Sequence, residues 1–383
     1  MERFDAIVIG AGVAGAAAAA SLARRGRVLV LEQFDFLHER GSSHGGSRIF
    51  RHAYEDPRYV RLAQAAEQRW RALEARSGER LLLRTGGLDL GTVGEGELDP
   101  IEAALGAAGS PVERLTADEV RRRFPAYVLG DDREALFSPD AGILAATRAV
   151  ATLLRDAAAE GAELMERMPV TDLALHDDGV EVATPAGRFS AERLVVAAGA
   201  WTDRLLTDLG VPLRVEQQQV LYLRVRDGRL HAPERMPVFI DRRGGIYGFP
   251  LFERPHALKV SDHEGAPTVL VGERTFDVDA NRAADTARRA ADLLPGVTTD
   301  VVAAQTCLYT KTPDEHFVLD RLPGHPYAVV MAGFSGHGFK FGAVLGDVAA
   351  ALLDGDSDAF DLGPFGLAGR AATWPAHAVE DRG

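Results

Sequence analysis

The 383-residue sequence contains very little cysteine and lysine: Cys307 is its one cysteine, and Lys259, Lys311 and Lys340 are the only lysines among 43 basic residues. A single cysteine excludes an intramolecular disulfide and a cysteine-rich zinc site, and we predict no metal site. Long apolar runs are lacking too, because Arg, Asp or Gly interrupts the most apolar segments before they reach the roughly 20 residues of a membrane-spanning helix. We therefore expect no membrane-embedded part.

Positive charge is too sparse for a nucleic-acid-binding surface. Acidic residues outnumber basic ones by 56 to 43, the net charge is −13, and no stretch concentrates enough positive charge to follow a phosphate backbone. The composition, 46% hydrophobic and 26% charged, is that of an ordinary folded protein and excludes disordered and collagenous chains. The sequence begins on a strand-like run, Phe4 to Ile9, without the charged start and cleavable apolar stretch of a signal peptide. We therefore predict a cytoplasmic protein.

The scarcity of lysine makes the three lysine positions informative. The chain uses arginine for nearly all of its positive charges, so each remaining lysine invites a specific explanation. An ammonium group is a compact charge whose pKa changes readily on burial, whereas a guanidinium is planar and permanently charged. Chance retention on the surface is the alternative.

A glycine pattern near the start predicts a dinucleotide-binding site. Gly10, Gly12 and Gly15 form G-x-G-x-x-G between a strand-like run and the Ala-rich helical stretch 13–25. The first glycine allows a tight turn, the second lets the backbone approach a pyrophosphate, and the third packs helix against strand. Glu32 ends the next strand, where a carboxylate accepts hydrogen bonds from the hydroxyls of an adenosine ribose. This unit alone suits FAD and NAD equally, and the acidic residue argues against a 2′-phosphorylated nicotinamide cofactor.

The rest of the chain alternates between helical and strand-like segments. Hydrophobic periodicity predicts helices over 60–73, 116–123, 146–160, 281–294 and 341–353. Alternating and β-branched residues separated by Gly, Pro and Asp predict antiparallel sheet over 217–271. Together these segments predict an α/β protein of two interleaved lobes. One is a Rossmann-like nucleotide-binding domain and the other a mainly antiparallel β-sheet substrate domain.

Five segments resemble those of the monomeric sarcosine oxidase family, which includes N-methyl-amino-acid and pipecolate oxidases. They are GAGVAG from Gly10, GSSHGGSRIFRHAY from Gly41, VVAAGAWT from Val195, CLYTKTPDEHFVLD from Cys307 and GFSGHGFKF from Gly333. The resemblance covers essentially the whole chain in order. It implies an FAD flavoprotein of the glycine/D-amino-acid oxidase fold.

The family's organisation implies a discontinuous division of this chain. We expect residues 1–85, 146–215 and 319–383 to form the FAD-binding domain. Residues 86–145 and 216–318 would form the substrate and catalytic domain.

The resemblance also implies roles for three cations. Arg51 and Lys340 resemble the pair that clamps the substrate carboxylate, one through a forked contact and the other as a point charge. Lys259 matches the lysine that lies over the flavin ring and promotes the reaction with O2, because a fixed positive charge stabilises the superoxide that develops. For Lys259 an outward-facing position on a strand is the alternative.

Further residues match family positions around the flavin and the substrate. Cys307 matches the cysteine that joins covalently, through sulfur, to the methyl group on the flavin's benzenoid ring; a buried, inert thiol is the alternative. His263, Tyr309 and Tyr247 resemble residues that line the substrate pocket. The predicted cofactor-binding positions are Gly10, Gly12, Val13, Ala14, Gly15, Glu32, Gln33, Ser42, Ser43, His44, Arg48, Val170, Ala198, Gly199, Trp201, Cys307, Gly336, His337, Gly338 and Lys340.

Two features depart from the family pattern. Residues 251–258 form a slightly longer segment than in sarcosine oxidase, which can alter the roof of the pocket. Asp262 stands where the family pattern leads us to expect an aromatic residue. Both argue against sarcosine itself as the preferred substrate.

We predict a monomeric FAD-dependent oxidase of secondary α-amino acids, such as sarcosine, other N-methyl amino acids or cyclic imino acids, that makes an imine and reduces O2 to hydrogen peroxide. The alternatives are a flavin dehydrogenase or specialised biosynthetic imino-acid oxidase of the same fold, a non-catalytic flavin sensor, and an NAD-dependent dehydrogenase. Lys259, Arg51 and Lys340 argue against the sensor, since FAD binding alone needs none of them. The Cys307 segment argues against the NAD enzyme.

Overall fold

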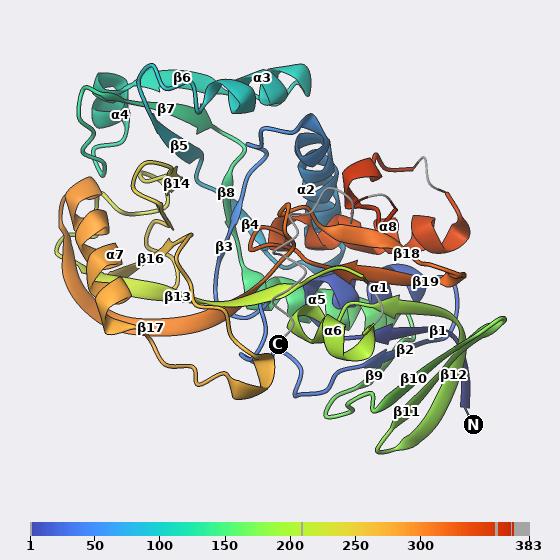
Figure 1. The fold of residues 1–383 in the computed structure, drawn as a ribbon. Helices are drawn as coiled ribbons and strands as arrows, with labels where there is room; N and C mark the ends of the chain where they lie inside the picture. Colours follow the sequence, from blue (N-terminus) through green and yellow to red (C-terminus); the bar gives the residue numbers. More distant parts are fainter. Residues whose placement is uncertain (1, 208–209, 357–358, 369, 371–383) are drawn as a thin grey trace.

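A computed structural model describes residues 2–207, 210–356, 359–368 and 370. The described residues form two eight-stranded sheets and one three-stranded sheet, with helices packed against them (Figure 1). The arrangement confirms the predicted α/β fold with a nucleotide-binding unit at its start.

The first large sheet contains the nucleotide-binding unit. Its strands run in the order β10-β11-β12-β1-β2-β9, with β19 beside β12 and β18 beside β19. Strand β1 is parallel to β2 and β12, and β12 is parallel to β19, whereas β10, β11 and β12 form an antiparallel meander. The bounds are β1 Glu2–Ile9, β2 Val28–Leu31, β9 Glu163–Met165, β10 Asp172–His176, β11 Gly179–Thr184, β12 Gly187–Val196, β18 Val318–Leu322 and β19 His325–Ala332.

Small residues let helices pack closely on this sheet. Helix α1 (Val13–Leu22) is rich in alanine and almost fully buried, and it lies against α8 (Gly342–Asp354) and α5 (Ala146–Ala159). A Cβ atom at Gly346 of α8 would lie 2.3 Å from the carbonyl oxygen of Ala17, so only glycine permits this crossing. Helix α2 (Pro57–Ser77) covers the other side of α8, and the buried Trp70 of α2 donates a hydrogen bond of 2.7 Å to the carbonyl oxygen of Lys340.

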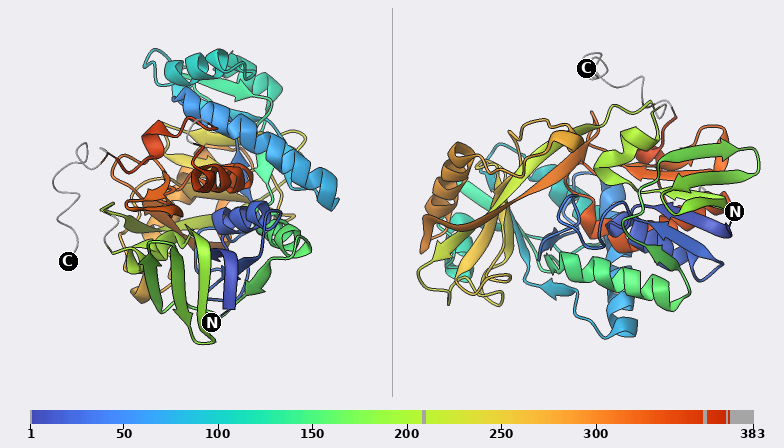
Figure 2. Two further views of the ribbon diagram at one scale, coloured as in Figure 1. Left: turned by 90° about the vertical axis from the view of Figure 1, so that its right-hand side faces the viewer. Right: turned by 90° about the horizontal axis from the view of Figure 1, so that it is seen from below.

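The second large sheet is mainly antiparallel, as the sequence predicts. Its order is β17-β13-β16-β15-β14-β5-β7-β6, and only β14 and β5 are parallel neighbours. Helix α7 (Ala280–Leu293) packs against it, and α3 (Asp99–Ala107) and α4 (Ala117–Arg123) lie near β6 and β7 (Figure 2). The bounds are β5 Gly87–Thr92, β6 Glu113–Thr116, β7 Arg133–Ser138, β13 Arg214–Val225, β14 Val238–Asp241, β15 Ile246–Gly248, β16 Ala257–Asp262 and β17 Val297–Lys311.

Three short strands connect the two large sheets. Strands β3 (Arg48–Phe50) and β4 (Leu82–Arg84) both pair with β8 (Gly142–Leu144). The loop that precedes β3 is the GSSHGGS segment, so this small sheet determines where that loop lies.

Some predicted boundaries differ from the structure. Residues 307–310 are the last part of the 15-residue β17, whose first half is largely exposed. Pairing with β13 over most of its length stabilises this half, and the sequence alone does not show that pairing. The helix expected near Trp201 is a 3-10 turn, Gly199–Trp201, followed by the single-turn helix α6 (Thr202–Leu205).

The two large sheets draw on different parts of the chain. Strands of the first lie within residues 2–31, 163–196 and 318–332, and those of the second lie within 87–138 and 214–311. The domain boundaries expected from the sequence stay a prediction, and part of the expected range 319–383 lies outside the described residues. None of the described helices is both long and apolar enough to cross a membrane.

Candidate active site

A cavity of about 840 Å³ is lined by residues from both large sheets and from the loop before β3. It brings together every site residue that the sequence predicts, with one exception. Gly15 lies outside the lining, and a Cβ atom there would be only 1.8 Å from the carbonyl oxygen of Gly10. Gly15 therefore packs helix against strand, as its place in the glycine pattern requires.

One end of the cavity is formed by the turn between β1 and α1. Gly10 has a φ of +97°, and a Cβ atom there would lie 2.5 Å from the carbonyl oxygen of Ala197. Gly12 is the N-cap of α1 and supplies no capping side chain. The first turn of α1, with Val13 and Ala14, therefore presents backbone amide groups and the positive end of the helix dipole to the cavity.

Glu32 lies on the wall beside this turn. One carboxylate oxygen accepts a 2.9 Å hydrogen bond from the backbone nitrogen of Ala11, and the other accepts one of 3.0 Å from Phe34. His38 Nε2 lies 3.5 Å from the second oxygen. Burial raises the pKa of Glu32, but the hydrogen bonds from His38, Ala11 and Phe34 outweigh burial and the net pKa is lowered. Glu32 is therefore an ionised acceptor, which a ribose needs.

The loop before β3 ties the helix end to strand β17. Ser43 Oγ accepts a 3.1 Å hydrogen bond from the backbone nitrogen of Val13, and Ser42 Oγ donates one of 2.6 Å to the carbonyl oxygen of Leu308. Arg48 donates to the carbonyl oxygens of Ser42 and His44, at 2.8 and 2.7 Å. These bonds give the loop one defined path along the cavity.

His44 of this loop has no hydrogen-bond partner for either ring nitrogen within the described part of the chain, although it is buried. Burial and the neighbouring Arg48 lower the pKa of His44 to about 3. The ring is neutral at physiological pH. Two unpartnered nitrogens on the cavity wall indicate a ligand that supplies polar atoms there.

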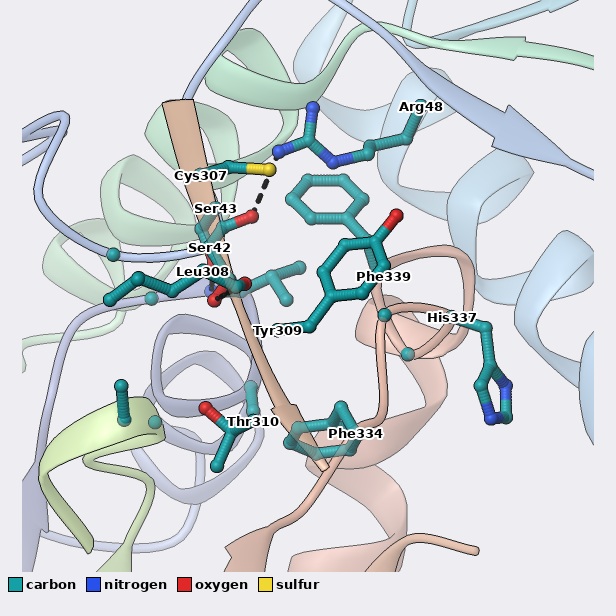
Figure 3. A pocket seen from close by; sticks show the side chains of 18 of the residues that line it. Ser42, Ser43, Arg48, Cys307, Leu308, Tyr309, Thr310, Phe334, His337 and Phe339 are labelled. Atoms are coloured by element: carbon teal, nitrogen blue, oxygen red, sulfur yellow. Dashed lines mark hydrogen bonds between the residues drawn. The ribbon is translucent and has the colours of Figure 1, made fainter. Parts of the chain in front are cut away.

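Cys307 lies in the middle of the cavity. Figure 3 shows the guanidinium of Arg48 beside its sulfur, with the ring of Tyr309 pointing into the same space. Burial raises the pKa of the Cys307 thiol, the charges of Arg48, Lys259 and Arg274 oppose that effect, and the net pKa is raised. The thiol is accessible to a ligand in the cavity, and three cations stabilise its thiolate form.

Arg51 and Lys340 both lie against the ring of Tyr54 in the cavity lining. The guanidinium carbon of Arg51 lies 4.5 Å from the ring centroid of Tyr54, and Lys340 Nζ lies 5.2 Å from it. Lys340 Nζ donates hydrogen bonds of 2.7 Å to the Tyr54 hydroxyl and to the carbonyl oxygen of His337. Asp89 Oδ1 lies 4.0 Å from Arg51 Nη1. Arg51 Nη1 is buried without a hydrogen-bond partner among the described residues.

Burial and the charge of Arg51 both make the charged form of Lys340 less favourable. Burial lowers the pKa of Lys340 well below its usual value, and Arg51 lowers it further, whereas Asp89 acts in the opposite direction. An anion bound next to both groups would satisfy the free N–H group of Arg51 and stabilise the charge of Lys340. The pair is therefore chemically suited to bind an anion such as a carboxylate.

An aromatic wall stands opposite these cations. The hydroxyls of Tyr247 and Tyr309 are 3.2 Å apart, and the ring of His263 lies 5.8 Å from that of Tyr309 and 6.2 Å from that of Tyr247. Burial lowers the pKa of His263, and Lys311 and Arg51 lower it further. The wall is therefore uncharged.

Asp262 does not line the cavity. It faces the opposite side of β16, where its carboxylate lies 3.0 Å from Arg282 of α7. The pocket change inferred from this residue is therefore wrong, because the side chains of a strand alternate between its two faces.

Lys259 of β16 lines the cavity and is only 5% exposed, so the outward-facing alternative is wrong. Its Nζ donates to the carbonyl oxygen of Ser47 at 3.0 Å and lies 3.2 Å from Glu253 Oε1. Burial and Arg48 lower the pKa of Lys259 to about 8, and Glu253 opposes this shift. No residue of 251–258 lines the main cavity. The longer segment therefore affects Lys259 rather than the pocket roof.

Sequence reasoning missed three functional neighbours: Tyr54, Asp89 and Glu253. Tyr54 stands three residues after Arg51 in a segment already singled out, so its proximity offered a signal. Asp89 comes from β5 and Glu253 from the segment before β16, and nothing in the sequence connects either carboxylate with its cation.

A strand, a glycine turn and a helix open into one cavity, which is also lined by buried cations and Cys307. This combination is typical of a dinucleotide-dependent oxidoreductase. Residues 5–352 match the family described as FAD dependent oxidoreductase, and the chain belongs to that family. The described residues contain no group of three metal-ligating side chains.

Individual relatives agree with the family assignment. The chain is 39% identical to monomeric sarcosine oxidase of Streptomyces avermitilis, with 94% of this chain and 96% of the relative covered. It is 35% identical to N-methyl-L-tryptophan oxidase of Salmonella arizonae, with 95% and 98% covered. Among solved structures it resembles NikD, an unusual amino acid oxidase essential for nikkomycin biosynthesis, at a TM-score of 0.82 and 28% identity, with 96% and 98% covered. These relatives confirm the predicted resemblance and the dependence on FAD.

The residues present fit FAD. Gly10 and Gly12 line the cavity without side chains, so the backbone of the turn is open to a pyrophosphate. Glu32 is an ionised acceptor next to that turn, and the unpartnered nitrogens of His44 lie on the way to Cys307. The roles of the individual residues stay predictions.

Proposed function

We propose that this protein is an FAD-dependent oxidase of secondary α-amino acids, in which Arg51 and Lys340 hold the substrate carboxylate. The observation that carries the proposal is the juxtaposition of these two buried cations on one tyrosine ring, in the same cavity as Lys259 and Cys307. The names of the relatives, sarcosine and N-methyl-L-tryptophan oxidases, point to secondary amino acids.

The protein's contribution to substrate binding is orientation. A forked contact from Arg51 and a point charge from Lys340 would hold the carboxylate against the Tyr54 side of the cavity. The substrate nitrogen would then lie toward the uncharged wall of Tyr247, Tyr309 and His263. An uncharged wall favours the neutral amine over the ammonium form, so no strong base is required.

When bound, FAD would supply the electron chemistry, which is a two-electron oxidation of the amine and a two-electron reduction of O2. The neutral amine would lose a hydride from carbon and a proton from nitrogen to give the imine, and O2 with two protons would give hydrogen peroxide. Lys259 would present an ammonium charge to the oxygen, where it stabilises developing superoxide without any rearrangement. This charge favours an oxidase over a dehydrogenase of the same fold.

Covalent attachment of FAD through Cys307 is part of the proposal. Arg48, Lys259 and Arg274 support it, because their charges favour the thiolate that must attack the flavin's methyl-bearing ring. We further propose the domain division expected from the sequence, and a monomer, which the names of two relatives support. A cytoplasmic location stays a prediction.

A second candidate is a specialised biosynthetic imino-acid oxidase. The similarity to NikD favours it. Both candidates share the carboxylate site and differ in what occupies the space beside the aromatic wall, so the choice of substrates decides between them.

The test is anaerobic reduction of the bound flavin by sarcosine, N-methyl amino acids, L-proline, L-pipecolate and primary amino acids, followed by admission of air. Bleaching by a secondary amino acid, with rapid recovery in air and one hydrogen peroxide per substrate, is the expected result. Amines lacking the carboxylate serve as matched controls and should bleach much more slowly. Bleaching by none of the amino acids, with flavin present, would contradict the proposal.

A further inference from the structure

A second cavity of about 420 Å³ lies behind Lys259. It shares Gly45, Thr147 and Gln305 with the main cavity, and the exposed Glu39 and Arg254 place it at the protein surface. Its lining is Glu39, Gly45, Gly46, Thr147, Tyr222, Glu253, Arg254 and Gln305. A second cavity at the protein surface therefore borders the main cavity near Gly45, Thr147 and Gln305.

Glu253 separates the two cavities and is held by four donors. Its Oε1 accepts from Ser47 Oγ and lies 3.2 Å from Lys259 Nζ. Its Oε2 accepts from the Tyr222 hydroxyl at 2.6 Å and from the backbone nitrogen of Gly46 at 3.1 Å. A Cβ atom at Gly46 would be 2.5 Å from the carboxylate carbon of Glu253. The carboxylate therefore has one defined position, which depends on a glycine opposite it.

The charge of Lys259 depends on this carboxylate. The groups that face the ammonium are Arg48 of β3, Cys307 of β17, His44 of the loop before β3, and Glu253. Arg48 repels it, Cys307 is a neutral thiol on balance, and His44 is neutral. Glu253 is thus the one carboxylate within 4.0 Å of Lys259 Nζ among the described residues. A buried ammonium beside an arginine and without a counter-charge gives up its proton.

We propose that Glu253 is a positioning residue for the oxygen step: it keeps Lys259 as an ammonium group aimed into the main cavity, and it links that group to solvent through the second cavity. The inference rests on the proposed oxidase function. It assigns a role to the longer segment 251–258, whose Glu253 contacts Lys259 from outside the substrate pocket.

The consequence is a shifted pH limit. Lys259 supports the oxygen reaction when protonated, so the rate is high below its pKa and falls as the pH rises through it. Both burial and Arg48 lower the pKa of Lys259, and Glu253 raises it. Removing the charge of Glu253 therefore lowers that pKa further, and an opposite charge at this range is worth about 1 to 3 pH units.

The experiment compares wild type with Glu253→Gln and with Glu253→Asp, which keeps the charge on a shorter side chain. The bound flavin is reduced with dithionite, without amino acid, and mixed with oxygen from about pH 5 to about pH 10. The midpoint potential of the flavin is measured over the same range. Glu192→Gln is the matched control, because Glu192 is an exposed partner of Arg3, at 2.9 Å, away from both cavities.

Glu253→Gln should lose oxygen reactivity at a pH about 1 to 3 units lower than wild type. Below that limit its flavin potential should be more positive, since the unpaired ammonium stabilises reduced flavin. Glu253→Asp should fall between the two, and Glu192→Gln should match wild type.

Superimposable pH profiles and potentials for wild type and Glu253→Gln, with Lys259→Met still slow, would overturn this inference and leave the oxidase proposal intact. A Lys259→Met protein that reacts with oxygen as fast as wild type would overturn the oxygen role of Lys259 and this inference with it. Should Glu253→Gln not fold, a Glu253→Asp profile identical to wild type in both pH limit and potential would overturn the inference.

Discussion

The two ends of the main cavity are built in different ways. The nucleotide end comes from one continuous stretch, residues 10–32, and consists of a glycine turn, a helix N-terminus and one carboxylate held by backbone nitrogens. The reaction end collects Arg51, Lys259, Cys307 and Lys340 from β16, β17 and loops far apart in the chain.

The difference concerns what each end must hold. Backbone amides and a helix dipole need only the right local conformation, which glycine supplies. Several buried cations near one another need counter-charges and hydrogen bonds from elsewhere, since burial opposes charge. Asp89 and Glu253 act in that way at opposite sides of the reaction end. The sequence therefore predicts the residues of the nucleotide end, but only some of the residues of the reaction end.

Replacing Cys307 by serine tests whether the nucleotide end alone can hold FAD, and we expect the largest effect from this variant. If the nucleotide end suffices to hold FAD, the native Cys307→Ser protein stays yellow, and acid precipitation releases all of the colour into the supernatant. Wild-type protein should keep its colour in the pellet. Colour that stays in the Cys307→Ser pellet would contradict the covalent link.

The pH dependence of that attachment tests the thiol. The raised pKa of Cys307 leaves little thiolate at neutral pH, so attachment to added FAD should speed up roughly tenfold per pH unit below that pKa. A rate that is flat or falls with rising pH would show that thiolate formation does not limit attachment.

Lys259→Met tests the charge at the reaction end alone. Reaction of reduced flavin with oxygen should slow by about 100- to 1000-fold, the range seen when one preorganised charge-stabilising group is lost. Anaerobic reduction by substrate should be unchanged. Lys311→Met is the matched control, because Lys311 pairs with Glu315 and Glu216 and does not line the cavity. Stopped-flow absorbance separates the two half-reactions, and equal oxygen rates in both variants would refute the assignment.

Arg51→Met tests whether substrate binding at the reaction end needs both Arg51 and Lys340. Loss of charge-assisted hydrogen bonds worth about 1.5 to 3 kcal/mol should lower kcat/KM by about 10- to 150-fold, while flavin reduction by dithionite and flavin content stay as in wild type. Arg188→Met removes an exposed arginine as a control. A loss of flavin together with activity would instead place Arg51 in cofactor binding.

The smallest effect is expected away from the cavity. Thr116 and Glu119 form a capping box at the start of α4, as the sequence predicts. Thr116→Ala should cost about 1 kcal/mol, which lowers the Tm by about 1 °C in a chain of this size. Turnover should not change. A change in kcat would show that the second sheet transmits local stability to the site.

The sequence predicts features that depend on neighbouring residues more accurately than features that depend on contacts between distant parts of the chain. Strand β2 and helix α5 begin where the local pattern predicts, because periodicity and flanking residues act within a few positions. The length of β17 escaped prediction because its exposed first half is stabilised by pairing with β13. The argument from Asp262 against sarcosine loses its basis, because strand alternation directs this residue toward Arg282 and away from the cavity.

By itself the sequence determined the nucleotide-binding turn, the two-lobed α/β architecture and the family, because these depend on local backbone requirements and on motifs read along the chain. Only the tertiary structure decided that Lys259 faces the cavity, that Arg51 and Lys340 both contact Tyr54, and that Glu253 is the counter-charge of Lys259. The physical reason is that buried charges are balanced across space by residues whose separation along the chain carries no signal of their contact.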